Sequence, residues 1–432
     1  MVDENPLAKI AREPMHARQI LAIAILTLCT AAEGFDVYAI SYAAPGIALA
    51  WDIDPATLGI VLAMDLVGMG IGAILLGLLA DRIGRRPVIL ACIAVMASGM
   101  WLASLAPEVH ALSATRLYTG MGVGGLLATS SAIVTELAND RRRSLAVTLL
   151  IGGFSLGALL GGTLVSSLLA RADRWETVFE VGALGTAALF IPAFLLVPES
   201  LEFLCRRQPR GTLVRVNRIL AQLGHGQVDA LPSPSPGGHG LRAHLAPELA
   251  RTAALLTIAF FMYMVSLYFL MKWIPKLVAD MGYASSSAGA VLVWAQVGGL
   301  VGTVVLSLLS QRYKVRLLVA GAMACGAVAV ALFGRYSEGI AMLTLIAFAA
   351  GFFVIGGNSG FYSIVAQSFP AEVRAAGTGF VIGTGRAGSA VGPIVAGFLF
   401  QAGWPLGNVS IVMSSGCIAA AACLVILQRS AR

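Results

Sequence analysis

Charged residues are scarce in this chain of 432 residues. Asp, Glu, Lys and Arg make up 12% of the sequence, whereas 58% is hydrophobic; soluble domains carry roughly 25% charged residues. The mean hydropathy is +0.85. A soluble fold of this length does not need so many apolar residues. The composition therefore excludes an ordinary soluble protein and indicates one that spans a membrane.

Motifs for catalysis and for metal binding are also missing. The six cysteines show no CxxC or other ligand spacing, which weakens both a disulfide and a metal interpretation. The sequence contains no nucleophile motif, metal-ligand cluster or phosphate-binding loop. We therefore expect no enzyme activity, no cofactor and no metal. The polar stretch up to Arg18 does not resemble a cleaved signal peptide.

About a dozen apolar stretches are long enough to cross a bilayer as helices. They are continuous rather than alternating, which favours helices over the strands of a barrel. The expected fold class is an all-α membrane protein with twelve transmembrane helices. We place the spans near 19–42, 56–80, 87–106, 112–136, 143–169, 175–198, 249–274, 286–310, 316–334, 339–365, 376–400 and 406–427.

The basic residues are distributed unevenly between the loops. About 22 of the 29 Lys and Arg residues lie at the termini and in the loops of one side. Five are assigned to the opposite loops: Arg171, Arg174, Lys272, Lys276 and Arg335. By the positive-inside rule both termini are cytoplasmic, and we expect a bacterial-type inner (plasma) membrane. The net charge of +7 then reflects the loops and not a nucleic-acid surface.

The chain divides into two similar halves. The expected segments are a tail at 1–18, a six-helix bundle at 19–198, a cytoplasmic linker at 199–248, a second six-helix bundle at 249–427 and a tail at 428–432. The linker holds a Pro-rich stretch at 232–238, which cannot continue a helix. Five arginines between residues 206 and 218 predict a short basic helix on the membrane surface.

A basic loop motif recurs between the halves. Asp81–Arg86 follows the second span, and Gln311–Arg316 follows the eighth, about 230 residues later. Repeats of this kind are typical of transporters built from pseudo-symmetric bundles. They predict a substrate site near the bilayer midplane, between the halves.

Several motifs resemble those of a known family. Gly77-Leu-Leu-Ala-Asp81-Arg82-Ile-Gly84-Arg85-Arg86 resembles the signature of the major facilitator superfamily between its second and third helices. Glu33-Gly-Phe-Asp36 resembles the Asp-Gly-x-Asp motif of the aromatic acid/proton symporters, which include 4-hydroxybenzoate, protocatechuate and benzoate transporters, with Glu in the first position. The resemblance covers nearly the whole chain. It implies the major facilitator fold and uptake of a benzoate-like carboxylate with protons.

Two acids of the first span are the main candidates for proton coupling. Glu33 and Asp36 are three residues apart and share one helix face. A charge at this depth costs at least roughly 2.5–3.5 kcal/mol, so it is rarely placed there without a use. A buried carboxylate can gain and lose a proton near neutral pH. We expect Asp36 to carry the proton, with Glu33 second; paired structural acids are the alternative. Asp65 is a third candidate, for which a structural hydrogen bond is an equal alternative.

Two arginines within spans are candidates for binding the substrate. Arg386 lies near the middle of the eleventh span, where its guanidinium could hold a substrate carboxylate or an acid of the first helix. Arg116 lies nearer the periplasmic end of the fourth span and could snorkel, so gating, pairing and binding all remain open. Polar and aromatic residues complete the candidate pocket, with ordinary packing or an aromatic belt at the membrane interface as the alternatives: Tyr38, Tyr42, Trp294, Gln296, Asn358, Phe361 and Tyr362. Asn358 is the strongest, because an amide in lipid needs a partner.

The first basic loop suggests a cytoplasmic gate. We expect Asp81 to cap or pair with a helix end of the other half, and Arg85 and Arg86 to bridge to acids such as Glu136. Such a latch would stabilise the outward-facing state. The candidate gate residues are Gly77, Asp81, Arg82, Gly84, Arg85, Arg86, Glu136 and Arg374; the alternative is a topology signal only.

The predicted function is proton-coupled import of an aromatic carboxylate by alternating access. Proton-coupled efflux, or uptake of another organic anion or drug, uses the same fold and stays an alternative. A non-transporting receptor is a third hypothesis, opposed by the short loops. The expected partners are the carboxylate, protons and membrane lipid, with no nucleic acid, and we expect a monomer.

Overall fold

Helices make up the regular structure of this protein. The computed structural model describes residues 5–171, 174–232, 247–336, 339–370 and 373–430, and these contain no strand. Eleven of their helical segments are long and apolar enough to cross a membrane. Ten are the single helices α2 (Ala17–Trp51), α3 (Pro55–Ile83), α4 (Arg85–Ser104), α5 (Val109–Leu137), α6 (Arg143–Leu169), α7 (Glu176–Leu196), α10 (Pro247–Asp280), α11 (Ser285–Leu309), α12 (Val315–Phe333) and α17 (Leu406–Ser430). The eleventh joins α13 (Ile340–Val354) and α14 (Asn358–Gln367).

The remaining span is broken in the middle. It consists of α15 (Arg374–Gly385) and α16 (Ala387–Gln401), which meet at Arg386. The backbone N–H of Arg386 still donates to the carbonyl of Ile382 at 3.0 Å, so the chain continues in nearly the same direction. The twelve predicted helices are therefore confirmed. The first is longer than expected, because α2 continues from residue 42 to Trp51.

Local signals in the sequence explain where the first helices end. α2 stops at Asp52, whose backbone is left-handed with φ 46°. Asp54 then caps α3 by accepting a hydrogen bond from the backbone N–H of Thr57 at 3.0 Å, which satisfies a free donor of the first turn. Hydrogen bonds from the hydroxyl and the backbone N–H of Thr57 hold the pKa of the Asp54 carboxyl below its ordinary value. At the other end, α3 stops at Gly84, where φ is 110°.

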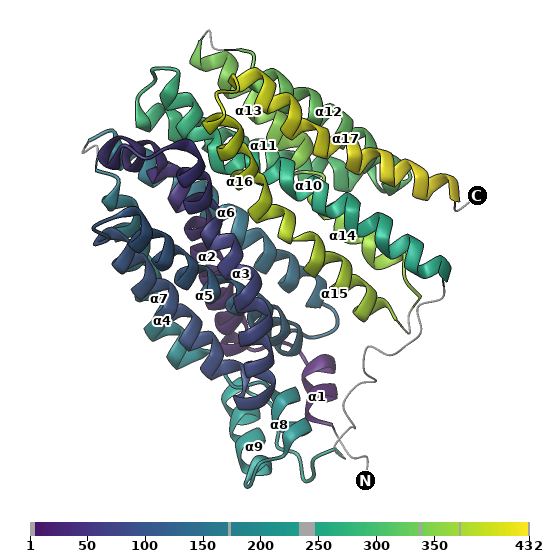
Figure 1. The fold of residues 1–432 in the computed structure, drawn as a ribbon. Helices are drawn as coiled ribbons and strands as arrows, with labels where there is room; N and C mark the ends of the chain where they lie inside the picture. The colour runs from purple at the N-terminus through teal and green to yellow at the C-terminus, as the bar shows by residue number, and fades with distance from the viewer. Residues whose placement is uncertain (1–4, 172–173, 233–246, 337–338, 371–372, 431–432) are drawn as a thin grey trace.

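The helices form two groups that lie side by side (Figure 1). The first half contains α2 to α7, and the second contains α10 to α17. The main contacts between the halves join α3 to α16, α6 to α11 and α2 to α10. We call the end of the bundle that carries both termini the termini side, and the opposite end the far side.

Glycines let the halves touch on the far side. A Cβ on Gly59, near the start of α3, would lie 2.6 Å from the carbonyl oxygen of Pro393 on α16. A Cβ on Gly289, near the start of α11, would lie 2.6 Å from Oγ of Ser166 on α6. Such spacing is typical of membrane helices that pack backbone to backbone. The two halves are therefore closed against each other on the far side.

Two short helices, α8 (Leu201–Arg207) and α9 (Thr212–Leu223), lie below the first half together with α1 (Pro6–Arg12) (Figure 1). The sequence predicted one basic helix in this region, and that prediction was wrong. The chain turns at Gln208 and Gly211, which have φ 42° and 75°, and a helix cannot pass through left-handed residues. All but the first residue of the Pro-rich stretch 232–238 lies outside the described residues.

Candidate functional site

A buried ion pair joins the first and fourth spans. Nη1 of Arg116 lies 2.8 Å from Oδ1 of Asp36, and both side chains are fully buried. These two atoms form an ion pair without a hydrogen bond, and Nη2 of Arg116 donates to the backbone carbonyl of Asp36 at 2.9 Å. The guanidinium also lies 5.5 Å from the ring centroid of Phe179, a favourable cation–π distance. Snorkelling of Arg116 was one expected possibility, and its complete burial shows that this one was wrong.

Asp65 extends the pair into a network of four charges. Its Oδ2 lies 3.4 Å from Nη2 of Arg116 and 2.6 Å from Nζ of Lys272. Asp65 and Lys272 are almost completely buried, at 1% and 0% exposure. The two carboxylates and two cations sum to zero formal charge. Their mutual pairing explains how four charges can lie inside a membrane protein, where buried charges otherwise need a partner.

Lys272 was missed by the sequence analysis, which placed it in a far-side loop. The seventh span was expected to end at residue 274, but α10 continues through Pro275 to Asp280. Lys272 therefore lies inside the helix, and its ammonium donates to the backbone carbonyl of Val37 at 2.5 Å. The sequence does contain a signal for this pair. Lys272 is a basic residue within one apolar run, and Asp65 is a single acidic residue within another.

Glu33 lies on the same helix as Asp36 but has no cation within ion-pair distance among the residues that the structure describes. It is fully buried, and neither carboxylate oxygen has a hydrogen-bond partner in the described part of the chain. The charged groups that act on it are Arg386 of the second half and Asp36. An unpaired buried charge is costly, so Glu33 stands out among the acids of the site.

Arg386 stands at the break between α15 and α16. Its Nη2 donates to the hydroxyl of Tyr362 at 3.3 Å. Tyr362 in turn packs against Phe260, with ring centroids 5.7 Å apart. No carboxylate within the described ranges lies within ion-pair distance of Arg386, so the expected acid of the first helix is not a direct partner in this structure. The guanidinium of Arg386 therefore contacts the neutral phenol of Tyr362, at a position where a charged partner could bind.

The other aromatic and amide candidates are separated by the structure. Phe361 is fully buried and stacks on Tyr263 at 4.8 Å, so it packs within the second half. Gln296 is buried, whereas Trp294 is 49% exposed; two residues apart on a helix, they point in nearly opposite directions. Oδ1 of Asn358 is buried and has no hydrogen-bond partner among the described residues.

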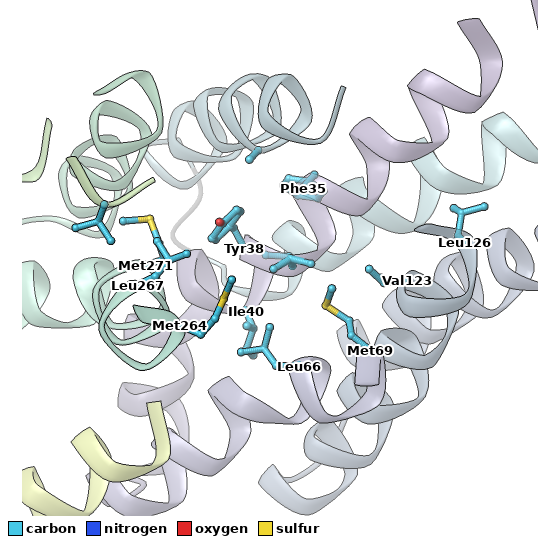
Figure 2. Close-up of a cluster of buried hydrophobic side chains, with 14 of the residues drawn as sticks. Phe35, Tyr38, Ile40, Leu66, Met69, Val123, Leu126, Met264, Leu267 and Met271 are labelled. Carbon is cyan, nitrogen blue, oxygen red and sulfur yellow. The ribbon is translucent and has the colours of Figure 1, made fainter. Parts of the chain in front are cut away.

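Tyr38 and Tyr42 follow the two acids along α2. Tyr42 is 1% exposed, and Cβ atoms on Gly162 of α6 or Gly289 of α11 would touch it. It therefore lies within the closed far-side contact. Tyr38 belongs to an apolar layer between the halves (Figure 2). That layer includes Ile40 of α2, Leu66 and Met69 of α3, and Met264, Leu267 and Met271 of α10. Methionine side chains adapt readily to a surface that must repack.

The predicted gate residues form a network within the first half. Arg85 pairs with Glu136 and lies 3.1 Å from Glu202. One carboxylate oxygen of Glu199 accepts the backbone N–H groups of Arg85 and Arg86 at 2.8 and 3.1 Å, which caps the start of α4. These contacts hold the ends of α4, α5 and α7 together on the termini side.

The expected contact from this loop to the second half is not found among the residues that the structure describes. The Asp81 side chain is exposed and has no ion pair within the described residues; its backbone carbonyl accepts from Nε of Arg207 at 3.2 Å. Arg82 is exposed, and a Cβ on Gly77 would stand in open space. On the second half, Arg374 is exposed and donates to the carbonyl of Phe369 at 3.3 Å.

Twelve spans in two halves, with buried charges between them, define a multi-pass membrane transporter. The sequence profile of the Major Facilitator Superfamily matches residues 26–275 and 255–432. The chain belongs to this superfamily. Among solved structures, the inward-open xylose transporter XylE from E. coli has a TM-score of 0.72 at 17% identity, covering 94% of this chain and 96% of that one. The nucleoside transporter NupG has a TM-score of 0.71 at 13% identity, covering 95% and 99%.

Curated relatives match over nearly the full length. A gallate transporter from Pseudomonas putida is 31% identical over 97% of this chain and 93% of its own. A 3-(3-hydroxy-phenyl)propionate transporter from Escherichia coli (strain K12) is 30% identical over 96% of both. A 4-hydroxybenzoate transporter from Pseudomonas putida is 28% identical over 91% of this chain and 89% of its own. The predicted relation to aromatic-acid transporters is confirmed, and the chain is a transporter and not an enzyme.

Proposed function

We propose that this protein imports a small aromatic carboxylate together with a proton, by alternating access. In this proposal it acts as a monomer in the bacterial inner membrane, with both termini in the cytoplasm. The bundles 19–198 and 249–427 move as two units about the site. The observation that supports this best concerns two buried groups of opposite charge: among the described residues, Arg386 has no acid and Glu33 no cation within ion-pair distance.

The charges of the site suggest how the proton and the carboxylate are coupled. With Glu33 protonated, Arg386 is an uncompensated cation and attracts the substrate carboxylate. With Glu33 ionised, Glu33 itself compensates the charge of Arg386 and competes with the substrate. A proton on Glu33 therefore favours a carboxylate on Arg386. We expected Asp36 to carry the proton, but its pairing with Arg116 favours Glu33 for this role.

The surroundings of Arg386 favour an aromatic acid. Tyr362 already contacts the guanidinium, and its ring could stack against a bound benzene ring. The unpaired Oδ1 of Asn358 could accept a hydrogen bond from a ring hydroxyl. The gallate, 3-(3-hydroxy-phenyl)propionate and 4-hydroxybenzoate transporters among the relatives support a hydroxylated aromatic carboxylate.

The far-side contacts support an assignment of this structure to the state open to the termini side, which is the cytoplasm in this proposal. The exposed Asp81 and Arg374 then lie apart because that side is open. In the opposite state they would approach and form the expected latch. Rocking of the bundles would exchange the far-side glycine contacts for the latch.

Uptake into proteoliposomes tests the proposal. Purified protein is reconstituted and given radiolabelled benzoate, 4-hydroxybenzoate or gallate, with an acidic exterior or with no pH difference. We expect accumulation of at least one acid, driven by the pH difference and abolished by a protonophore. Xylose serves as a control substrate that should not accumulate. Absence of gradient-driven uptake of every acid would refute proton symport, and accumulation in everted vesicles would favour efflux.

A further inference from the structure

Lys272 makes the one ion pair that crosses between the halves in the part of the chain that the structure describes. Its ammonium lies 2.6 Å from Oδ2 of Asp65 on α3. It also donates to the backbone carbonyl of Val37 on α2 at 2.5 Å. Both bonds run from the second half to the first. Both must therefore break together if α10 separates from α2 and α3.

Burying this ion pair carries a cost. Taking two charges out of water costs so much that well-packed apolar residues often stabilise a protein as well as a buried ion pair does. The surroundings are largely apolar: Met264, Leu267 and Met271 of α10 belong to one buried cluster with side chains of α2 and α3 (Figure 2). A buried lysine in such surroundings is therefore a candidate for a contact that is made and broken during function.

Asp65 and Lys272 differ in the charged partners that each keeps when the two separate. Asp65 has a second cation, because Nη2 of Arg116 lies 3.4 Å from the same carboxylate oxygen. Lys272 has no other acid within ion-pair distance among the described residues. Opening the far side would therefore leave Asp65 compensated by Arg116, within the first half, and leave Lys272 as an unpaired cation facing the newly opened space.

We propose that Lys272 exchanges its partner, from Asp65 to the carboxylate of the substrate, when the far side opens. The inference rests on the proposed function and assigns a second carboxylate-binding group to it. A small organic carboxylate from the far side pairs with the free ammonium while Asp65 moves towards Arg116. Closure of the far side restores the bond between Lys272 and Asp65 and displaces the carboxylate towards Arg386.

The next lysine along α10 provides a matched control. Lys276 is one turn nearer the far side and pairs with Asp280 of the same helix. Its ion pair therefore does not cross between the halves. Lys276→Met removes the same charge as Lys272→Met from the same helix, without affecting the contact in question.

The first measurement is the KM of radiolabelled 4-hydroxybenzoate in exchange across proteoliposomes, which needs no proton gradient. Lys272→Met should raise the KM by about tenfold or more, because a charge-assisted bond to the carboxylate is lost. Asp65→Asn should leave the KM unchanged or lower it, because the competitor for the ammonium is gone. Lys276→Met should leave it unchanged. An equal rise for Lys272→Met and Asp65→Asn would show a purely structural pair and overturn the proposal.

The second measurement is labelling of a cysteine on the far side. Ser166 faces Gly289 across the halves, so Ser166→Cys reports opening of that side to a membrane-impermeant maleimide, against the background of the parent protein. Adding Lys272→Met should speed labelling, and adding Lys276→Met should not. Faster labelling with an unchanged KM would make Lys272 a latch only and overturn the exchange of partners.

A double variant keeps the test valid if Lys272→Met does not fold. Lys272→Met combined with Asp65→Asn removes both charges, and its KM should still rise; an unchanged KM in this folded variant contradicts the proposal. The labelling comparison needs no substrate. If the unaltered protein moves no aromatic acid, the proposed function fails, and the loss of the latch in Lys272→Met can still be measured.

Discussion

Glu33 and Asp36 share one face of α2 but have opposite surroundings. Asp36 lies 2.8 Å from Nη1 of Arg116, whereas Glu33 has no cation within ion-pair distance among the described residues. Both are fully buried. Two carboxylic acids, one turn apart, thus differ: one is held as a counter-ion, and the other is the proposed proton carrier.

Replacing each acid by its amide should therefore have different results. Glu33→Gln imitates the protonated acid, so we expect exchange of 4-hydroxybenzoate to persist and accumulation driven by a pH difference to be lost. The melting temperature of Glu33→Gln should not fall. Asp36→Asn leaves Arg116 short of a counter-ion and should destabilise the fold by about 3–5 kcal/mol.

Both variants are compared in proteoliposomes and by thermal unfolding in detergent. Normal gradient-driven accumulation by Glu33→Gln would exclude Glu33 as the proton carrier. If Asp36→Asn proves as stable as the unaltered protein but fails to accumulate substrate, Asp36 would regain that role.

Arg386 should set the affinity for the carboxylate. Arg386→Gln removes a charged partner of the substrate, and we expect a loss of about 2–5 kcal/mol, or roughly 30-fold or more in KM. Arg386→Lys keeps the charge without the two-pronged geometry and should be intermediate. The exposed Arg312 is a suitable control, because Arg312→Gln leaves the site untouched. A KM for Arg386→Gln within twofold of that for Arg312→Gln would argue against carboxylate binding at this position.

The capping carboxylate of Glu199 should be important for stability on the termini side. Glu199→Gln weakens charge-assisted bonds to two backbone N–H groups of α4, and we expect a loss of about 1–3 kcal/mol. Glu202→Gln breaks a pair whose acid is 52% exposed and should cost about 0–1 kcal/mol. Melting temperatures in detergent would check this; an equal effect of the two changes would contradict the capping role.

Two glycines of α6 provide a test of close helix packing. A Cβ on Gly157 would overlap the backbone carbonyl of Ala31 on α2, whereas a Cβ on Gly152 would meet nothing within 4 Å. We expect Gly157→Ala to lower the melting temperature and the uptake rate. Gly152→Ala should raise helix stability by up to about 1 kcal/mol, because alanine favours helix over glycine. Equal melting temperatures for the two variants would contradict the packing shown by the structure.

The sequence was sufficient to predict the spans and the resemblance to a transporter family, because apolar length and loop motifs are local signals. It also singled out Glu33, Asp36, Asp65 and Arg386 as charges in apolar runs. The pairing of these charges depends on which helices meet, and helix neighbours far apart in the sequence leave no local trace. Arg116 was thus left with three open roles.

Lys272 shows most clearly why the rest could not be predicted. A lysine three residues before Pro275 looks like the end of a span, because proline often ends a helix. In the structure α10 passes through Pro275 and ends at Asp280. The lysine is buried because Asp65, about 200 residues earlier in the chain, lies opposite it. The exposed Trp294 is the reverse case, where an aromatic residue in a span faces away from its buried neighbour Gln296.

The neutrality of the four-charge network has an electrical consequence. Moving one elementary charge through a membrane potential of 100 mV involves about 2.3 kcal/mol. Asp36, Arg116, Asp65 and Lys272 carry no net charge together, so shifting them as a group does little work against the membrane voltage. While Lys272 and Asp65 are paired, this network therefore adds little to the voltage dependence of rocking, although four ionised side chains lie deep within the protein.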